Sequence, residues 1–336
     1  METTTELDAT YGIRRRRIHT NGVELDVLES GPNDGPLVIL AHGFPECAWS
    51  WRHQLHALGR GGWHVVAPDQ RGYGRSHRPT EVDQYSTEHL GNDLLGIVDQ
   101  ITGPGSPAVF VGHDWGSFVV WDIAREHPER VRGLVNMSVP FVDWPAKPTE
   151  LFKMINGDNF FYILYFQPVG VAEAELDPQV ERCMRGILWA ASGEGYPDTS
   201  PPPRPAAGTG FLDVMTGPPG GSLPAWCSDE DLAVYIDSFS ASGFFGPVSW
   251  YRNLDQNYAR VASSPISGMT MPCYFIGGSK DLVIARDPTF EDRNRLVPGY
   301  RRMTMIDGAG HWTQQERPDE VNAALLEYLG EIASGA

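Results

Sequence analysis

One stretch of ten residues, 108–117 (AVFVGHDWGS), constrains the fold more than any other part of the chain. It begins as an apolar run, breaks at Gly112 and Gly116, and continues into a second apolar run over residues 118–124. This order predicts a strand, a tight turn and a helix, and the glycines let the helix pass close to the strand. Asp114 lies between them at the tip of the turn. The spacing is typical of a nucleophile elbow, a strained turn that lifts a nucleophile above a parallel sheet.

An aspartate at the tip of such a turn predicts a particular chemistry. A serine that attacked a saturated carbon would form an ether, which water does not easily cleave, whereas a carboxylate forms an ester that can be hydrolysed at its own carbonyl. Aspartate has a reference pKa of about 3.9 and therefore needs no base to activate it at neutral pH. Asp114 thus predicts displacement at carbon, as in epoxides or alkyl halides. The alternative is an ordinary aspartate that caps the following helix.

Composition excludes several classes of protein. The net charge is −17, from 26 basic and 43 acidic residues, which argues against a nucleic-acid surface. The basic run at residues 14–17 precedes no long apolar segment, so we expect neither a signal peptide nor a membrane anchor there. We read it as a solvated strand edge. No apolar run is long enough to span a membrane. The cysteines are scattered without a CxxC pattern, so we expect reduced thiols in a cytoplasmic protein and no metal site; they are Cys47, Cys183, Cys227 and Cys273.

Strand and helix patterns alternate through most of the chain, which predicts a mostly parallel sheet covered by helices on both faces. Asn21-Gly22 predicts a hairpin between residues 16–20 and 23–28. Apolar runs typical of buried strands fall at residues 36–41, 63–68, 108–111, 131–139, 271–276 and 302–306. Helical patterns fall at residues 51–58, 86–101 (with Ser86 as the cap), 118–124 and 321–332.

The alternation stops after residue 139. We therefore predict a core domain formed by residues 1–139 and 260–336, with residues 140–259 inserted as a helical cap. The insertion contains a strongly aromatic segment at 160–167 and a stretch at 193–226 rich in glycine and proline. A long irregular stretch of this kind is usually a functional loop or a mobile lid.

The sequence also offers partners for Asp114. In this order of elements, the acid and then the histidine follow the nucleophile along the chain. Two histidines follow Asp114, and His127 falls at the far end of the helix that the elbow begins. His311, in a glycine-rich loop after the last strand, is therefore the candidate base, with an ordinary surface histidine as the alternative. Asp281 follows the preceding strand and is the favoured acid; weaker candidates are Asp287, Asp292 and Asp307.

Four short motifs together give the chain a family resemblance: HGFP at 42–45, GYGRS at 72–76, GHDWG at 112–116 and GHWTQ at 310–314. In this order and at these separations they resemble the soluble-type epoxide hydrolases of the α/β-hydrolase fold, over roughly residues 16–330. The resemblance implies a mostly parallel central sheet wrapped by helices, with a helical cap inserted after the strand that follows the nucleophile helix.

The resemblance also implies roles for residues of this chain. Asp114 would attack an epoxide carbon, and His311, oriented by Asp281, would activate the water that hydrolyses the ester. Tyr162 and Tyr251 of the cap would hold and protonate the epoxide oxygen. From the residues alone, Tyr165 is as good a candidate as Tyr162, and plain aromatic packing of the cap is a further alternative.

The remaining site residues follow from the same resemblance. The backbone N–H groups of Phe44 and Trp115 would form the oxyanion hole, and the substrate pocket would be lined by Phe44, Trp115, Phe161 and Trp312. The implied substrate is a small lipophilic epoxide, and the chemistry requires neither a metal nor an organic cofactor.

Two other functions are compatible with an aspartate elbow. A haloalkane dehalogenase shares the elbow and a tryptophan after the nucleophile, but it holds halide with N–H donors and does not require paired cap tyrosines. Phe44 also stands where that family commonly has a polar amide. A non-catalytic small-molecule receptor on the same fold would leave the acid–histidine pair unexplained. For an epoxide hydrolase, detoxification and a biosynthetic step are both compatible roles.

Overall fold

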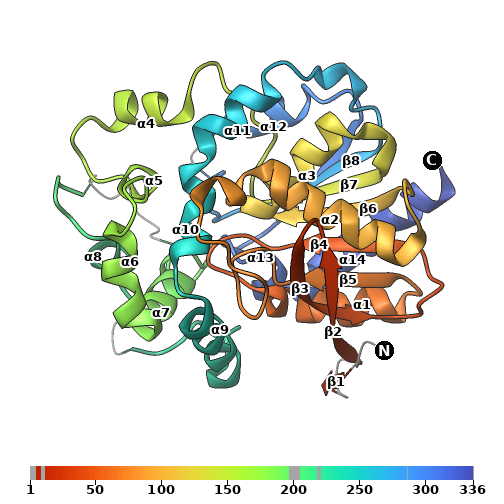
Figure 1. Ribbon diagram of the computed structural model, residues 1–336, viewed down its shortest axis with the longest axis horizontal. Helices are drawn as coiled ribbons and strands as arrows, with labels where there is room; N and C mark the ends of the chain where they lie inside the picture. The colour runs from red at the N-terminus through yellow and green to blue at the C-terminus, as the bar shows by residue number, and fades with distance from the viewer. Residues whose placement is uncertain (1–4, 9–11, 197–204, 218–220, 286, 336) are drawn as a thin grey trace.

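A nine-stranded sheet forms the centre of the molecule (Figure 1). The computed structural model describes residues 5–8, 12–196, 205–217, 221–285 and 287–335. The strand order is β1-β2-β3-β5-β4-β6-β7-β8-β9. Strands β1, β2 and β3 are antiparallel, and β5, β4 and β6 to β9 are parallel to one another. The strands are β1 Thr5–Asp8, β2 Ile13–Thr20, β3 Val23–Ser30, β4 Leu37–Ala41, β5 His64–Pro68, β6 Ala108–His113, β7 Val131–Met137, β8 Cys273–Gly278 and β9 Tyr300–Ile306.

The antiparallel strands at the N-terminus confirm one prediction and correct another. Thr20 pairs with Val23 across a two-residue turn in which Asn21 (φ 46°) and Gly22 (φ 76°) both have positive φ, as the predicted hairpin requires. The strand that carries residues 14–17 is an edge only in part, because β1 pairs with residues 13–15 of β2, while the side chain of Arg17 is 47% exposed. The arginines of β2 form ion pairs with acidic side chains of β3, namely Glu24, Asp26 and Glu29.

Helices cover both faces of the sheet, as predicted. Neighbouring residues of one strand, such as Val38 and Ile39, belong to different apolar clusters, which explains why the central strands are apolar throughout. Helices α1 (Arg52–Arg60) and α14 (Pro318–Ser334) pack in the cluster that contains Val38. Helices α2 (Thr87–Thr102) and α3 (Trp115–Glu126) pack in the other. The side chain of Ser86 caps α2 by accepting from the N–H of His89, as predicted.

A helical insert, defined here as helices α4 to α11, lies between β7 and β8 (Figure 1). Its helices are α4 Pro148–Asn156, α5 Tyr162–Tyr165, α6 Val171–Leu176, α7 Val180–Ala190, α8 Phe211–Val214, α9 Asp229–Ser242, α10 Phe245–Arg252 and α11 Leu254–Val261. Residue 259, where the predicted cap ends, lies within α11. Of the glycine- and proline-rich stretch 193–226, residues 197–204 and 218–220 lie outside the described residues, and the rest contains only the short helix α8.

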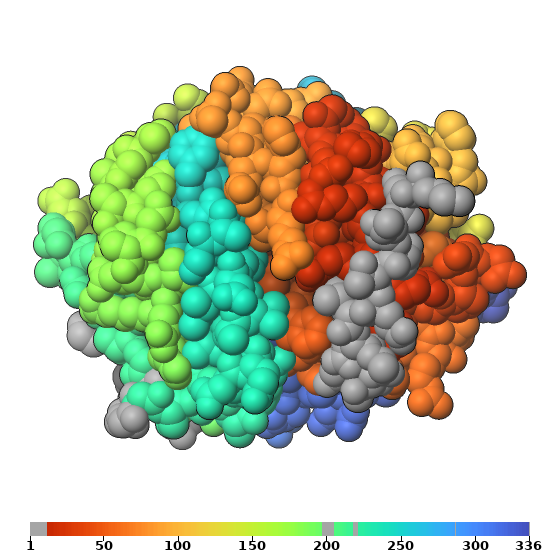
Figure 2. All heavy atoms as spheres, turned by 60° about the horizontal axis from the view of Figure 1, so that its bottom comes forward, coloured from red at the N-terminus to blue at the C-terminus, as the bar shows by residue number. Residues whose placement is uncertain are grey.

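The insert packs closely on the core. Figure 2 shows α10 beside the segment that contains the 3-10 helix η2 (Val82–Tyr85), and the rings of Phe245 and Tyr85 lie 6.1 Å apart. The remaining short elements are α12 Phe290–Asn294, α13 Thr313–Glu316, η1 Ala48–Trp51, η3 Pro128–Arg130, η4 Asp177–Gln179 and η5 Ile266–Gly268. None of the helices among the described residues is both long and apolar enough to cross a membrane.

Candidate active site

Asp114 lies at the turn between β6 and α3, in a backbone conformation that non-glycine residues rarely adopt (φ 52°, ψ −120°). The turn depends on its glycines, because a Cβ on Gly112 would lie 2.4 Å from the carbonyl oxygen of Gly116. A Cβ on Gly116 would lie 2.0 Å from the carbonyl oxygen of Ala41. Asp114 is the N-cap residue of α3, yet its side chain makes no capping hydrogen bond. The helix-cap alternative is therefore wrong.

The structure brings Asp114, His311 and Asp281 together. Nδ1 of His311 lies 3.0 Å from Oδ1 of Asp281, and Nε2 lies 3.4 Å from Oδ2 of Asp114. Asp281 follows β8, and His311 lies in the loop between β9 and α13, so the ends of the parallel strands β6, β8 and β9 supply all three side chains. His311 is only 6% exposed, which rules out an ordinary surface histidine. His127, at the C-cap of α3, has a side chain that is 44% exposed.

The two carboxylates control the charge of His311. Burial by itself lowers the pKa of His311, but the charges and hydrogen bonds of Asp281 and Asp114 outweigh it and raise the pKa well above its ordinary value. For Asp281, burial raises the pKa, and the charge and hydrogen bond of His311 bring it below the usual range. When one of the two carboxylates loses its charge, the pKa of His311 must fall.

The N–H group of Phe44 donates to Oδ1 of Asp114 at 2.8 Å, so the loop after β4 already holds one carboxylate oxygen. Trp115 is the first residue of α3, and its backbone N–H therefore belongs to the N-terminal set that has no partner within the helix. One predicted oxyanion donor thus contacts Asp114, and the other belongs to the next residue in the chain.

A buried carboxylate and imidazole, Glu46 and His113, which sequence reasoning left without a role, join three parts of the site. Oε2 of Glu46 accepts from the N–H of Gly43 at 2.9 Å and lies 2.6 Å from Nδ1 of His113. Nε2 of His113 lies 2.7 Å from the carbonyl oxygen of His311. Burial raises the pKa of Glu46, but the charge of His113 and hydrogen bonds bring it to about 2. The signals available in the sequence were Glu46, directly after HGFP, and His113, within GHDWG, since a buried carboxylate needs a partner.

Tyr162 of α5 and Tyr251 of α10 face each other, with ring centroids 5.7 Å apart. Tyr251 also lies 4.9 Å from the ring of Trp115, the residue after Asp114. Burial, and then the charge of Asp114, raise the pKa of both phenols above the ordinary value, so both hydroxyl groups keep their protons. Tyr165 instead donates to Oε2 of Glu175 at 2.7 Å, and its hydroxyl is therefore engaged elsewhere.

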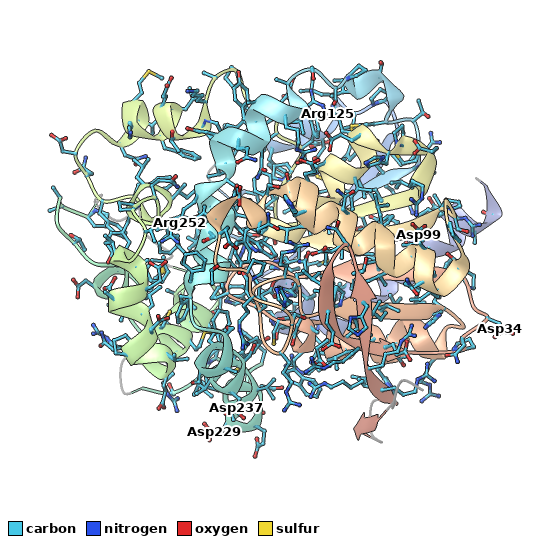
Figure 3. All side chains as sticks on the ribbon, in the orientation of Figure 1. Asp34, Asp99, Arg125, Asp229, Asp237 and Arg252 are labelled. Carbon is cyan, nitrogen blue, oxygen red and sulfur yellow. The ribbon has the colours of Figure 1, made fainter. Side chains whose placement is uncertain are left out.

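Arg252 holds the two tyrosine-bearing helices together (Figure 3). Its Nε donates to the carbonyl oxygen of Phe166 at 2.9 Å, and its Nη1 pairs with Oε1 of Glu173 at 2.8 Å. The Arg252 and Glu173 side chains are 3% and 11% exposed, so solvent screens this ion pair only weakly. The end of α10 is thereby fixed against the segment that follows α5.

The predicted pocket residues occupy different parts of the site. Phe44 lies 5.3 Å from the ring of Tyr251, and Phe161 lies 5.2 Å from that of Tyr162. Trp312 is 1% exposed and packs 4.9 Å from the ring of His311. The structure adds Phe166, whose ring contacts those of Phe44, Tyr162 and Tyr251. The side chains packed around Tyr162 and Tyr251 are therefore mostly aromatic. Over the described ranges, no group of three or more metal-ligating side chains could hold a metal ion.

Comparison with known proteins identifies the family. The family model described as "alpha/beta hydrolase fold" matches residues 36–161. Epoxide hydrolase A of Mycobacterium tuberculosis (strain ATCC 25618 / H37Rv) is 45% identical over 318 residues, which cover 94% of this chain and 96% of that protein. The chain belongs to the epoxide hydrolase family. The predicted α/β-hydrolase fold and the family resemblance are thus confirmed.

Other members of the epoxide hydrolase family give the same result. The crystal structure of epoxide hydrolase A from Mycobacterium thermoresistibile superposes with a TM-score of 0.85 at 43% identity, covering 97% of this chain and 98% of that one. The bifunctional epoxide hydrolase 2 of Mus musculus is 35% identical, and the matched region covers 92% of this chain and 54% of that protein. The dehalogenase and receptor alternatives are not favoured.

Proposed function

We propose that this protein hydrolyses a lipophilic epoxide to a vicinal diol through a covalent ester on Asp114. One observation carries the proposal: two protonated phenols, the partly buried Tyr162 and the buried Tyr251, lie beside an aspartate nucleophile. An epoxide needs this combination, because its oxygen must gain a proton as the ring opens. A halide leaving group does not.

Ring opening begins when Oδ2 of Asp114 attacks one epoxide carbon, because Oδ1 is held by the N–H of Phe44. The carbon–oxygen bond of the epoxide breaks, and the oxygen takes a proton from Tyr162 or Tyr251. The products of this step are an alkyl ester of Asp114 and a phenolate. No base is required, and His311 takes no part in the bond changes.

Ester formation prepares His311 for the second step. The ester carries no charge, so one of the two carboxylates that raised the pKa of His311 is lost. As its pKa falls, His311 gives up its proton, which neutralises the phenolate. Neutral His311 then takes a proton from water, and the water oxygen attacks the ester carbonyl. Oδ1 becomes the oxyanion, which the N–H groups of Phe44 and Trp115 stabilise.

Collapse of the tetrahedral intermediate completes the cycle. The bond between the carbonyl carbon and Oδ2 breaks, and Oδ2 leaves with the substrate as a hydroxyl group after taking the proton from His311. The regenerated Asp114 carboxyl group returns a proton to His311, which restores the starting state. The net reaction adds one water to one epoxide.

We further propose that the helical insert acts as a cap over this site and that its C-terminal boundary lies after α11 rather than within it. The aromatic side chains around Tyr162 and Tyr251 favour a lipophilic substrate, aryl epoxides included. Free, buried cysteines fit a cytoplasmic location; they are Cys47, Cys183, Cys227 and Cys273. Detoxification and a biosynthetic step both remain compatible with this chemistry.

Oxygen labelling tests the proposal. A single turnover in heavy-oxygen water, with enzyme in excess over styrene oxide, should give a diol with light oxygen only, and a peptide containing Asp114 should gain the label. If histidine-activated water attacked the epoxide directly, the diol would be labelled and the peptide would not. Turnover of 1,2-dibromoethane in place of styrene oxide would instead support the dehalogenase alternative.

A further inference from the structure

The carboxylate of Glu316, in α13, is buried and held by backbone N–H groups. The residue is 6% exposed. Its Oε2 accepts from the N–H of Gly193 at 2.8 Å and of Gly310 at 2.9 Å, and its Oε1 accepts from the N–H of Trp312 at 3.1 Å. Burial raises the pKa of Glu316, and these hydrogen bonds oppose that rise. A buried carboxylate is costly unless several donors satisfy it, so this position calls for an explanation.

These contacts join the histidine loop to the end of α7 in the helical insert. Between the same two segments, the N–H of His311 donates to the carbonyl oxygen of Ala191 at 2.8 Å, and the indole N–H of Trp312 donates to that of Leu188 at 3.1 Å. The backbones approach so closely that a Cβ on Gly193 would lie 2.1 Å from the carbonyl oxygen of Gly308. We call this contact between residues 188–193 and 308–312 the joint.

We propose that Glu316 is a positioning residue for His311, and that its carboxylate fixes the joint so that Nε2 of His311 faces the Asp114 ester. This inference rests on the proposed function. The histidine loop has glycine at 308 and at 310, so its backbone needs external restraint. Glu316 supplies that restraint on both sides of His311, at Gly310 and at Trp312.

The proposed mechanism separates this role from a merely structural one. Ring opening depends on Asp114 and on tyrosines of the helical insert, whereas ester hydrolysis depends on His311. If Glu316 only held the insert in place, its loss would displace Tyr162 and Tyr251 and slow ring opening. If it positions His311, its loss slows hydrolysis and the ester accumulates.

Glu316→Gln is the main variant, because glutamine is nearly isosteric but offers one acceptor oxygen, and its NH2 group would face N–H donors. Glu175→Gln is the matched control. Glu175 accepts from the N–H groups of Phe211 and Leu212, each at 3.0 Å, and from the hydroxyl of Tyr165, all within the insert. The chemical change is the same in both variants, and each removes a carboxylate that accepts from backbone N–H groups.

Rapid mixing of each variant with excess styrene oxide, followed by quenching and intact-protein mass spectrometry, measures ester formation and ester hydrolysis separately. For Glu316→Gln we expect ring opening within about twofold of wild type. Ester hydrolysis should be slowed by about tenfold or more, so that the ester becomes the main steady-state species. Glu175→Gln should keep the wild-type partition, meaning the ratio of the rate of ester formation to the rate of ester hydrolysis. Glu316→Asp keeps the charge on a shorter side chain and should fall between wild type and Glu316→Gln.

The outcomes are distinguishable. If wild type forms no Asp114 ester, the proposed function fails. If wild type forms the ester and Glu316→Gln leaves the partition unchanged, or slows ring opening as much as hydrolysis, the inference about Glu316 is overturned and the proposed function stands. If Glu316→Gln does not fold, Glu316→Asp decides by the same partition, with wild-type behaviour as the contradicting result.

Discussion

Replacing the tyrosines that face Asp114 by phenylalanine should slow ring opening specifically. Phenylalanine keeps the ring contacts, such as the 5.3 Å approach of Tyr251 to Phe44, and removes only the hydroxyl. Loss of one donor to a developing oxyanion costs about 10²–10³ in rate, or about 3–4 kcal/mol. Because a second phenol remains, Tyr162→Phe and Tyr251→Phe should each lose about 10² and retain measurable activity. The double variant should lose about 10⁴ or more.

The assay is the single-turnover rate of ester formation with an aryl epoxide, measured by rapid mixing and quenching. Tyr165→Phe is the control, because its hydroxyl bonds to Glu175. Its loss should cost about 1–2 kcal/mol of stability at most and leave ring opening unchanged. Single variants that match wild type, together with a slow Tyr165→Phe, would refute the assignment and place the functional phenol on the other side of α5.

Three further perturbations test other parts of the site. His311→Ala should stop turnover but still form the ester, which intact-protein mass spectrometry would detect; a variant that stays unmodified would mean that His311 also serves ring opening. Gly116→Ala should lower the unfolding free energy by about 1–3 kcal/mol or more, because its Cβ would lie 2.0 Å from the carbonyl oxygen of Ala41; an unchanged melting temperature would contradict that close approach. The pKa of His311 is raised in the folded protein, so its stabilising contribution is complete below the ordinary pKa of about 6.5 and is lost as the pH rises through the raised value. Thermal melts should therefore show wild type losing stability more steeply than His311→Gln as the pH rises on the alkaline side. Equal slopes of melting temperature against pH for the two proteins would contradict the raised pKa of His311.

Local signals in the sequence were sufficient for much of the fold. The Asn21-Gly22 turn, the Ser86 cap and the elbow at 112–116 depend on the conformations that a few adjacent residues allow, and each occurs where predicted. The apolar runs located the parallel strands, because a strand that is covered by helices on both faces has no polar face. The triad candidates followed from chain order and from their places at strand ends.

The sequence by itself therefore determined the elbow, the alternation of strands and helices, and the identities of Asp114, Asp281 and His311 as candidates. Only the tertiary structure decided which face of the one-turn helix α5 looks toward Asp114, because α5 is too short for periodicity to show a buried side. It also decided how buried charges are satisfied. Glu46 bonds to His113, and Glu316 bonds to backbone groups from a segment more than a hundred residues away. Arg14 and Arg15 likewise lie between two strands, because β1 pairs with β2 at these residues. Such partners come from distant parts of the chain, and only packing of the whole molecule selects them.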